Sequence, residues 1–358
     1  MPRPGATELM YLAQVIATGR LMHQAGENRS FTGRAQARLS QLMGVEHAIL
    51  VNSGTSALIV ALKAAGIGPG DEVLVPAYTW VSTASAVLFV GAVPILVEID
   101  ESLTIDPDDL ERKITRFSKA VVPVHMLNLV CDMERITDIA QRYNLVIVED
   151  ACQAAGAIYK GRRVGSIGHI GVFSFNHYKN LTSGEGGAVI TRDSSLFRRA
   201  TIYYDIGSFS KCYSDANLDF VGCNHRVSEL TSAVLFAQLG KLDKHLARLR
   251  KRRRKNIDRF LATSGARLSP HHDPQSAVGL TFIFDSPEEA RDYASRHPAI
   301  TRISDINRHN YVSWLPVLQH CRADPRTDPF RSAGREIAYT RDACTKTLDI
   351  LAKTCVIA

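Results

Sequence analysis

Short apolar runs rich in β-branched residues alternate with stretches at helical spacing between residues 44 and 191. A strand that is apolar on both faces is typical of a sheet covered by helices on both sides. Repeats of strand, helix and strand connect through right-handed crossovers, so the pattern predicts a mainly parallel sheet in an α/β fold. The last two runs are joined by a turn only and could pair antiparallel. The runs are "AILV" (48–51), "EVLVP" (72–76), "VPILVEI" (93–99), "AVVPVH" (120–125), "LVIVED" (145–150), "IGVFSF" (170–175) and "GAVIT" (187–191).

A second region follows, and we expect residues 244–358 to form a smaller α+β domain. Residues 277–284, "AVGLTFIF", are typical of a strand. The next helix starts with Ser286 as its cap, Pro287 at its first position and Glu289 placed to complete a capping box.

The remaining residues, 1–243, are predicted to form a large domain. A helix is expected over residues 5–19, ending at Gly19 and packing on the small domain. Its apolar residues are predicted to share one face: Leu9, Leu12, Ala13 and Ile16.

Composition limits the possible partners of this 358-residue chain. Hydrophobic residues make up 45% and charged residues 22%, as in ordinary globular proteins. No apolar run is long enough to span a membrane, and we expect no membrane partner. The net charge is +7, with the densest basic run at 244–260. Leucines at helical spacing within that run favour the solvated face of a helix, and no nucleic-acid motif accompanies it. We therefore expect no nucleic-acid partner.

The seven cysteines are scattered, odd in number and not arranged at metal-ligand spacings. This pattern favours reduced thiols in a cytoplasmic protein with no bound metal. Cys152 lies close to candidate functional residues, but a small buried thiol explains it equally well.

Polar residues follow several of the predicted strands, at the edge where ligands bind open parallel sheets. "NSGTS" (52–56) starts a helix, and Gly54 there lets backbone amides turn toward an anion. Other strand ends carry an aromatic residue, a carboxylate with an amide three residues later, and a hydroxyl followed by a lone amine. These residues are Trp80, Asp150, Gln153, Ser174 and Lys179.

A phosphate cradle, a flat aromatic ring, a carboxylate and a lysine match the needs of pyridoxal phosphate. The lysine forms a Schiff base with the aldehyde, and the carboxylate keeps the pyridine nitrogen protonated. Each feature alone has an ordinary explanation as a helix cap, a core residue or a solvated side chain. Their joint order along the chain favours the cofactor.

Five segments carry a family resemblance: "VNSGTSAL", "GDEVLVPAYTWVSTASAV", "VIVEDACQAAGA", "FSFNHYKNLTSGEGGAV" and "VGCNHRVSELTSAVLFAQLGKLD". They resemble the DegT/DnrJ/EryC1/StrS family of pyridoxal-phosphate-dependent sugar aminotransferases over about residues 5 to 260. The resemblance implies the aspartate-aminotransferase-like fold (fold type I), with a mainly parallel seven-stranded sheet between helices.

The resemblance also implies a role for each matching residue. Lys179 is the Schiff-base lysine and proton shuttle, Asp150 pairs with the pyridine nitrogen, and Gln153 lies near the phenolic oxygen of the ring. Trp80 stacks on the ring. Asn224 matches an asparagine that reaches the phosphate in the other subunit, which implies a homodimer with shared active sites. The phosphate ligands are Thr55, Ser56 and Ser174.

The chain departs from the family pattern at some positions. Asn128 and Val130 stand where Gly and Pro are common, and Asn176 stands where many members carry His. His309 and Tyr78 are candidates for contact with the substrate, although a plain surface histidine is at least as compatible with the sequence at 309.

The expected activity is transfer of an amino group from glutamate or glutamine to a keto-sugar, which we expect to be nucleotide-linked, or to a keto-cyclitol. The expected pathway is secondary-metabolite, including antibiotic, or surface-sugar biosynthesis. Some relatives are sugar dehydratases, but in these a histidine replaces the lysine, so Lys179 favours transfer. Three alternatives stay open: the same chemistry on another ketone, dehydration by an enzyme of the same fold, and a non-catalytic partner protein that binds pyridoxal phosphate.

Overall fold

The computed structural model describes residues 4–22, 30–206, 220–306 and 308–357. By packing, the chain divides into two compact units, and each is described separately. Unit 1 consists of Met1–Ile67, Val148–Gly156 and Gly161–Leu246, and unit 2 of Gly68–Ile147, Ala157–Lys160 and Ala247–Ala358. This division differs from the predicted boundary at residue 244, because unit 2 also contains strands of the large sheet. The large and small domains, 1–243 and 244–358, stay a prediction.

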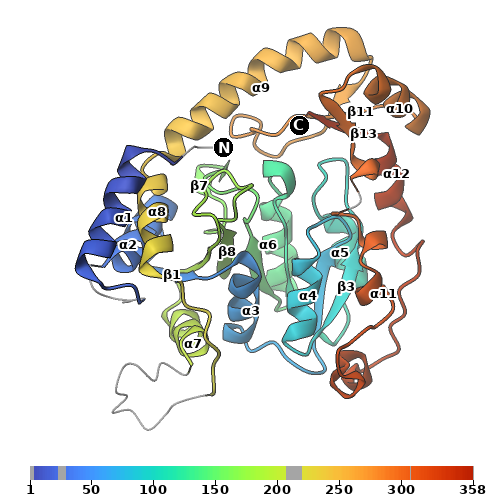
Figure 1. Ribbon diagram of the computed structural model, residues 1–358. Helices are drawn as coiled ribbons and strands as arrows, with labels where there is room; N and C mark the ends of the chain where they lie inside the picture. The colour runs from blue at the N-terminus through green and yellow to red at the C-terminus, as the bar shows by residue number, and fades with distance from the viewer. Residues whose placement is uncertain (1–3, 23–29, 207–219, 307, 358) are drawn as a thin grey trace. The chain divides into compact units, whose positions relative to one another are not determined.

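The central feature is a seven-stranded sheet in the order β1-β9-β8-β5-β4-β2-β3 (Figure 1). The neighbours from β8 to β3 pair in parallel, whereas β9 pairs antiparallel with both β8 and β1. The mainly parallel α/β fold and the antiparallel last pair are therefore confirmed. The strands are β1 (His47–Val51), β2 (Glu72–Pro76), β3 (Val93–Val97), β4 (Ser118–Val121), β5 (Val146–Asp150), β8 (Ile170–Ser174) and β9 (Gly187–Thr191).

Helices accompany these strands in both units. Unit 1 contains α1 (Ala6–Thr18), α2 (Phe31–Met43), α3 (Gly54–Ala64), α7 (Ser194–Tyr204) and α8 (Glu229–Leu239). Unit 2 contains α4 (Ser82–Phe89), α5 (Pro107–Lys113), α6 (Met133–Arg142), α10 (Pro287–Arg296), α11 (Leu315–Leu318) and α12 (Thr345–Lys353). The long helix α9 (Leu242–Ser264) begins in unit 1 and continues into unit 2.

A smaller antiparallel sheet lies in unit 2, in the order β10-β11-β13-β12. It packs with α9 and α10 around Phe282, which is fully buried. The expected small α+β element is thus present in the C-terminal part of the chain. Its strands are β10 (Arg267–Leu268), β11 (Thr281–Ile283), β12 (Ile300–Arg302) and β13 (Thr354–Ile357), and the short strands β6 (Ile158–Tyr159) and β7 (Arg162–Arg163) lie elsewhere.

The capping signals at Ser286, Pro287 and Gly19 behave as the sequence predicts. Ser286 caps α10 by accepting a hydrogen bond from the N–H of Glu289 at 3.2 Å, with Pro287 in the first turn. Gly19 ends α1 in the left-handed conformation, with φ of 66°. Because glycine has no Cβ, it adopts this conformation without steric cost.

The predicted apolar face of α1 is wrong. Leu9 and Ile16 are 71% and 61% exposed, whereas Glu8 and Val15 are buried. Glu8 is buried because its carboxylate is paired, with Lys241 Nζ 2.7 Å from Oε2. Val15 packs against α2 and α8. The described contacts of α1 are therefore with elements of the predicted large domain, and its packing on the small domain stays a prediction.

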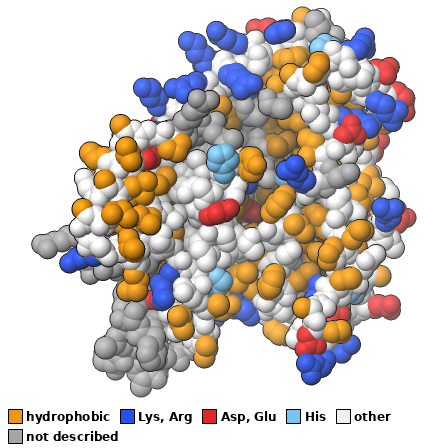
Figure 2. Space-filling model, viewed as in Figure 1, with side chains coloured by type: hydrophobic (Ala, Val, Ile, Leu, Met, Phe, Trp, Pro, Cys, Tyr) orange, Lys and Arg blue, Asp and Glu red, His pale blue; other side chains and the backbone are white. Residues whose placement is uncertain are grey.

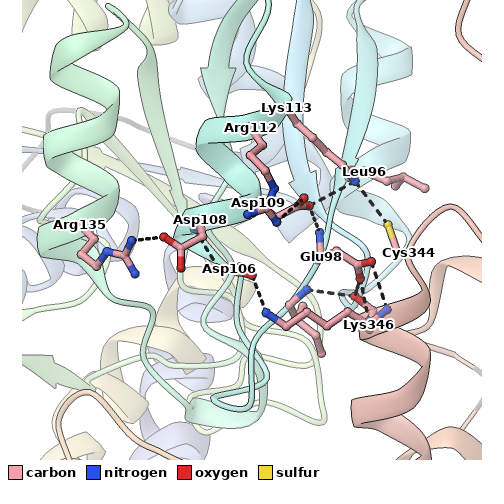
Figure 3. A network of polar contacts seen from close by, with 12 residues as sticks. Leu96, Glu98, Asp106, Asp108, Asp109, Arg112, Lys113, Arg135, Cys344 and Lys346 are labelled. Atoms are coloured by element: carbon pink, nitrogen blue, oxygen red, sulfur yellow. Dashed lines mark hydrogen bonds and ion pairs between the residues drawn. The ribbon is translucent and has the colours of Figure 1, made fainter.

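The start of α12 is fixed to the end of β3 within unit 2 (Figure 3). The Glu98 carboxylate accepts hydrogen bonds from the N–H groups of Lys346 (3.2 Å) and Thr347 (2.7 Å). The Lys346 ammonium also lies 2.7 Å from Asp106. A carboxylate at a helix N-terminus satisfies N–H groups that have no partner inside the helix, and it faces the positive end of the helix dipole.

The loop after β4 has an unusual backbone. Leu127 and Asn128 have φ of 51° and 63°, in the left-handed region. Asparagine tolerates this region better than most residues, which explains why it replaces the glycine of the family pattern at 128. A Cβ at Gly279 would lie 2.3 Å from the Leu127 carbonyl oxygen, and His271 Nε2 lies 3.4 Å from the Asn128 carbonyl oxygen. The loop is therefore held by the segment that precedes β11.

Candidate active site

The start of α3 in unit 1 forms a compact polar cradle. The Ser53 hydroxyl accepts a hydrogen bond from the N–H of Ser56 at 3.1 Å and so caps the helix. At Gly54, an added Cβ would lie 2.7 Å from Ser174 Cβ and 3.2 Å from Cys152 Sγ. No side chain fits there without displacing its neighbours. The ends of β5 and β8 therefore meet the beginning of α3. The predicted residues Gly54, Ser56 and Ser174 lie together there, and Thr55, which is half-buried, is in the same helical turn.

Asp150 ends β5 and is only 3% exposed. Its Oδ1 accepts a hydrogen bond from the N–H of Cys152 at 3.0 Å, which orients the carboxylate. Burial raises the pKa of the Cys152 thiol; the charge of Asp150 acts in the same direction and that of Lys179 in the opposite one. The carboxylate and the amine are thus both within electrostatic reach of one thiol. Gln153 lies in the turn that follows and is half-buried.

Lys179 lies in the turn between β8 and β9. Its N–H donates to the carbonyl oxygen of Asn176 at 3.0 Å. The Asn176 side chain accepts from the N–H of Tyr178 at 3.3 Å and donates to Glu185 at 2.9 Å. The asparagine that departs from the family pattern therefore organises the turn that carries the lysine.

Glu149 is a structural residue that the sequence analysis did not single out. Side chains alternate along a strand, so Glu149 points to the face opposite Asp150, and it is fully buried. Its carboxylate accepts hydrogen bonds from three backbone N–H groups, those of Gly165, Ile167 (2.8 Å) and Gly168 (2.7 Å). A glutamate inside an otherwise apolar strand was the available signal, because a buried carboxylate requires partners.

The aromatic candidates lie in unit 2. Trp80 is 45% exposed, whereas Tyr78 is buried, and burial raises the pKa of the Tyr78 phenol. The His309 ring centroid lies 5.7 Å from that of Trp80 and 6.1 Å from that of Tyr78. The N–H of Thr79 donates to the His309 carbonyl oxygen at 2.8 Å. The structure therefore brings His309 against the segment after β2.

Asn224 lies in unit 1, in a segment that runs beside the end of β1. Its side chain is exposed, and Oδ1 accepts a hydrogen bond from the N–H of Arg226 at 3.1 Å. The carbonyl oxygen of His225 accepts from the N–H of Asn52 at 2.9 Å, and Arg226 forms an ion pair with Asp205. The segment is thus anchored next to the cradle at α3.

The unit 1 residues fit a phosphate-bearing aldehyde cofactor. At Gly54 an added Cβ would meet Ser174 and Cys152, so the Ser174 hydroxyl lies close to the start of α3, the end of a helix that favours an anion. The buried Asp150 carboxylate bonds the N–H of Cys152, and the charge of Lys179 acts on the thiol of the same residue. Within residues 4–22, 30–206, 220–306 and 308–357, no group of three His, Cys, Asp or Glu side chains is placed to hold a metal ion. No helix in the same ranges is long and apolar enough to cross a membrane.

The fold and these strand-end residues define an aspartate-aminotransferase-like protein of fold type I. The structure of 3-amino-5-hydroxybenzoic acid synthase superposes with a TM-score of 0.81 and 27% sequence identity, covering 99% of this chain and 91% of that one. The profile of the DegT/DnrJ/EryC1/StrS aminotransferase family matches residues 3–307. The chain belongs to this family.

Two curated relatives are similar to this chain. An L-glutamine:2-deoxy-scyllo-inosose aminotransferase of Streptomyces kanamyceticus is 38% identical over 344 residues, covering 92% of this chain and 79% of the relative. A GDP-perosamine synthase of Caulobacter vibrioides is 42% identical over 209 residues, covering 57% of this chain and 55% of the relative. The chain thus spans little more than half of the second relative.

Proposed function

We propose that this protein is a pyridoxal-phosphate-dependent aminotransferase that moves an amino group from glutamine or glutamate to a keto-cyclitol or a keto-sugar. The observation that carries the proposal is the convergence at the start of α3. There Gly54 has no room for a side chain, Ser174 lies against it, and Asp150 and Lys179 both act on the Cys152 thiol. A site that binds an anion next to a reactive amine explains why a glycine, a hydroxyl, a carboxylate and an amine come together at this helix start.

Pyridoxal phosphate supplies an aldehyde and an electron-withdrawing ring. The helix start and the hydroxyls of Thr55, Ser56 and Ser174 hold the phosphate. Asp150, oriented by the Cys152 N–H, binds the protonated ring nitrogen, and Gln153 lies near the phenolic oxygen. These residues fix the position of the ring relative to the amine.

The Lys179 amine would bind the aldehyde of the cofactor, and the same amine is the group that would accept and donate a proton. The turn held by Asn176 positions this amine. Trp80 stacks on the ring, because a half-exposed aromatic at a strand end has a free face for a ligand. Tyr78 and His309 contact the substrate beside it.

The names of the relatives support the substrate class. The relative that covers 92% of this chain is named for glutamine as donor and for a keto-cyclitol as acceptor. The relative named GDP-perosamine synthase covers 57% and suggests a nucleotide-linked keto-sugar as the second choice. We therefore place a keto-cyclitol such as 2-deoxy-scyllo-inosose first among acceptors to be tested.

We also propose a homodimer with shared active sites, in which Asn224 reaches the phosphate of the partner subunit. Asn224 is exposed, and apolar side chains of α1 are exposed as well, with Leu9, Met10 and Ile16 between 49% and 71% accessible. Figure 2 shows hydrophobic side chains gathered over α1 and α8. A second copy of the chain would cover such a surface. The cysteines described as free thiols support a cytoplasmic location.

The test begins with the purified protein and pyridoxal phosphate. Borohydride reduction followed by peptide mass spectrometry should show the cofactor attached to Lys179. Glutamine should bleach the absorbance of the bound cofactor. Subsequent addition of 2-deoxy-scyllo-inosose should restore it. Lys179→Ala should fold and lose turnover. Attachment at another lysine, or turnover by Lys179→Ala at the wild-type rate, contradicts the proposal.

A further inference from the structure

His225 lies beside the start of α3 and is held in one orientation. Its Nδ1 lies 3.0 Å from Ser56 Oγ. Its ring stacks on that of Tyr203, with centroids 5.8 Å apart and planes inclined by 22°. Its backbone donates to Tyr204 and accepts from Asn52, both at 2.9 Å. The imidazole therefore faces Ser56 with little freedom to turn away.

The surroundings of His225 select one neutral tautomer. Nε2 is buried and has no hydrogen-bond partner in the described part of the chain. A buried N–H without a partner is less tolerable than a buried lone pair. We therefore assign the proton to Nδ1, so that Nδ1–H donates to Ser56 Oγ.

This tautomer determines where the Ser56 hydroxyl hydrogen points. Ser56 Oγ already accepts a hydrogen bond from the Ser53 hydroxyl at 3.0 Å. With His225 as a second donor, both lone pairs of Ser56 Oγ are used. The Ser56 hydrogen is then directed away from both neighbours and is available to an anion at the helix start. In the opposite tautomer, Nδ1 would be an acceptor, and the Ser56 hydroxyl would donate its hydrogen to Nδ1 instead of to an anion.

We propose that His225 is a positioning residue for the phosphate group: it turns the Ser56 hydroxyl toward the anion. It also takes up a proton at Nε2 when a dianion binds, because attraction to the dianion outweighs the cost of a second buried N–H. This inference rests on the proposed function, because it takes the start of α3 as the phosphate site. It assigns to His225 a role through Ser56 and makes dianion binding pH dependent.

The electrostatics agree with this assignment. Burial lowers the pKa of His225, so the ring is neutral at neutral pH without a ligand. The charges on the adjoining segment, those of Asp205 and Arg226, pair with each other. Burial raises the pKa of the Tyr203 phenol, and the nearby Cys223 thiol adds to this shift, so the phenol is uncharged. The first turn of α3 has no charged side chain. A dianion bound next to Ser56 would favour the imidazolium form of His225.

Sulfate is a suitable probe, because it stays a dianion where phosphate titrates. Its binding to the full chain freed of cofactor is measured by calorimetry between about pH 6 and pH 8. In the wild type, affinity should rise as the pH falls, approaching tenfold for each pH unit. His225→Phe keeps a ring against Tyr203 but loses the donor, so its affinity should be about tenfold weaker than that of the wild type at pH 8 and should not depend on pH. The difference from the wild type should therefore grow as the pH falls to 6.

His225→Asn is the matched control, because its amide donates to Ser56 without titrating. It should bind sulfate within about threefold of the wild type at high pH and should also lose the pH dependence. Pyridoxal without phosphate should bind all three proteins equally. If both variants keep the wild-type pH slope, the inference about His225 is overturned; if His225→Phe does not fold, the slope of His225→Asn decides alone.

The two proposals fail in different ways. If borohydride attaches pyridoxal phosphate to Lys179 but the variants bind sulfate like the wild type, only the role of His225 is wrong. If the wild type neither attaches the cofactor at Lys179 nor binds sulfate, the proposed function fails, and the role of His225 fails with it.

Discussion

Replacing Glu149 by Gln tests how the strand that carries Asp150 is anchored. The carboxylate is fully buried, and its two oxygens accept three backbone hydrogen bonds: Oε1 from Gly165, and Oε2 from Ile167 and Gly168. The amide of Gln has one oxygen and one NH₂ group. If its oxygen takes the place of Oε2, its NH₂ group faces the N–H of Gly165, and a buried donor is left opposed by another donor.

The size of the effect follows from these contacts. A buried donor without a partner costs about 1–3 kcal/mol, and the two remaining bonds weaken because their acceptor is no longer charged. We therefore expect Glu149→Gln to lower the free energy of unfolding by about 3 kcal/mol. Glu149→Ala leaves all three donors without a partner and should cost more. Added salt should change neither difference much, because Glu149 is shielded from the solvent.

The assay is urea unfolding followed by circular dichroism, which reports on the helices and strands of the chain as a whole. Glu46→Gln, at an exposed position, is the matched control and should change stability by less than about 0.5 kcal/mol. Equal urea midpoints for Glu149→Gln and the control would show that the three N–H groups do not depend on the carboxylate, and the reasoning would be refuted.

Two further predictions concern the cradle at α3 and the loop after β4. Gly54→Ala places a Cβ 2.7 Å from Ser174 Cβ, so it should lower stability by about 1–3 kcal/mol and weaken the binding of pyridoxal phosphate. Adding Ser174→Gly should restore the stability measured by thermal unfolding but not the affinity for the cofactor. Unchanged cofactor affinity in Gly54→Ala would contradict the assignment of the cradle. Burial lowers the pKa of His271 from 6.5 to about 4. The folded chain therefore binds fewer protons than the unfolded chain between these values, and stability falls as the pH drops through this window, by about 2 kcal/mol at pH 5 from this residue. His271→Gln should show a correspondingly weaker loss between about pH 7 and pH 5 in urea titrations, and identical pH profiles would count against a buried neutral His271.

Much of the fold was predictable because its signals are local. Continuous apolar runs predicted each end of the strands to within four residues, and Ser286 with Pro287 predicted the start of α10. The family pattern, read along the chain, also pointed to Gly54, Asp150, Ser174 and Lys179 as a set. The structure places Gly54 and Ser174 together at the start of α3, and it places Asp150 and Gly54 next to Cys152.

The wrong prediction and the missed residues have one physical cause. The exposed face of α1 was misassigned because a paired Glu8 is buried in place of Leu9, and the partner that makes this possible, Lys241, lies far along the chain. The contact between His225 and Ser56 joins residues 169 positions apart. Spacing within a single helix or strand carries no information about such partners.

The amino-acid sequence by itself determined the order of strands and helices, the membership of the family and the chemical groups at the strand ends, since these depend on periodicity and residue type. Only the tertiary structure decided which face of α1 is buried, which N–H groups Glu149 binds and which nitrogen of His225 meets Ser56. Those features depend on atoms brought within about 3 Å of each other by packing, because hydrogen bonds act only at such short range.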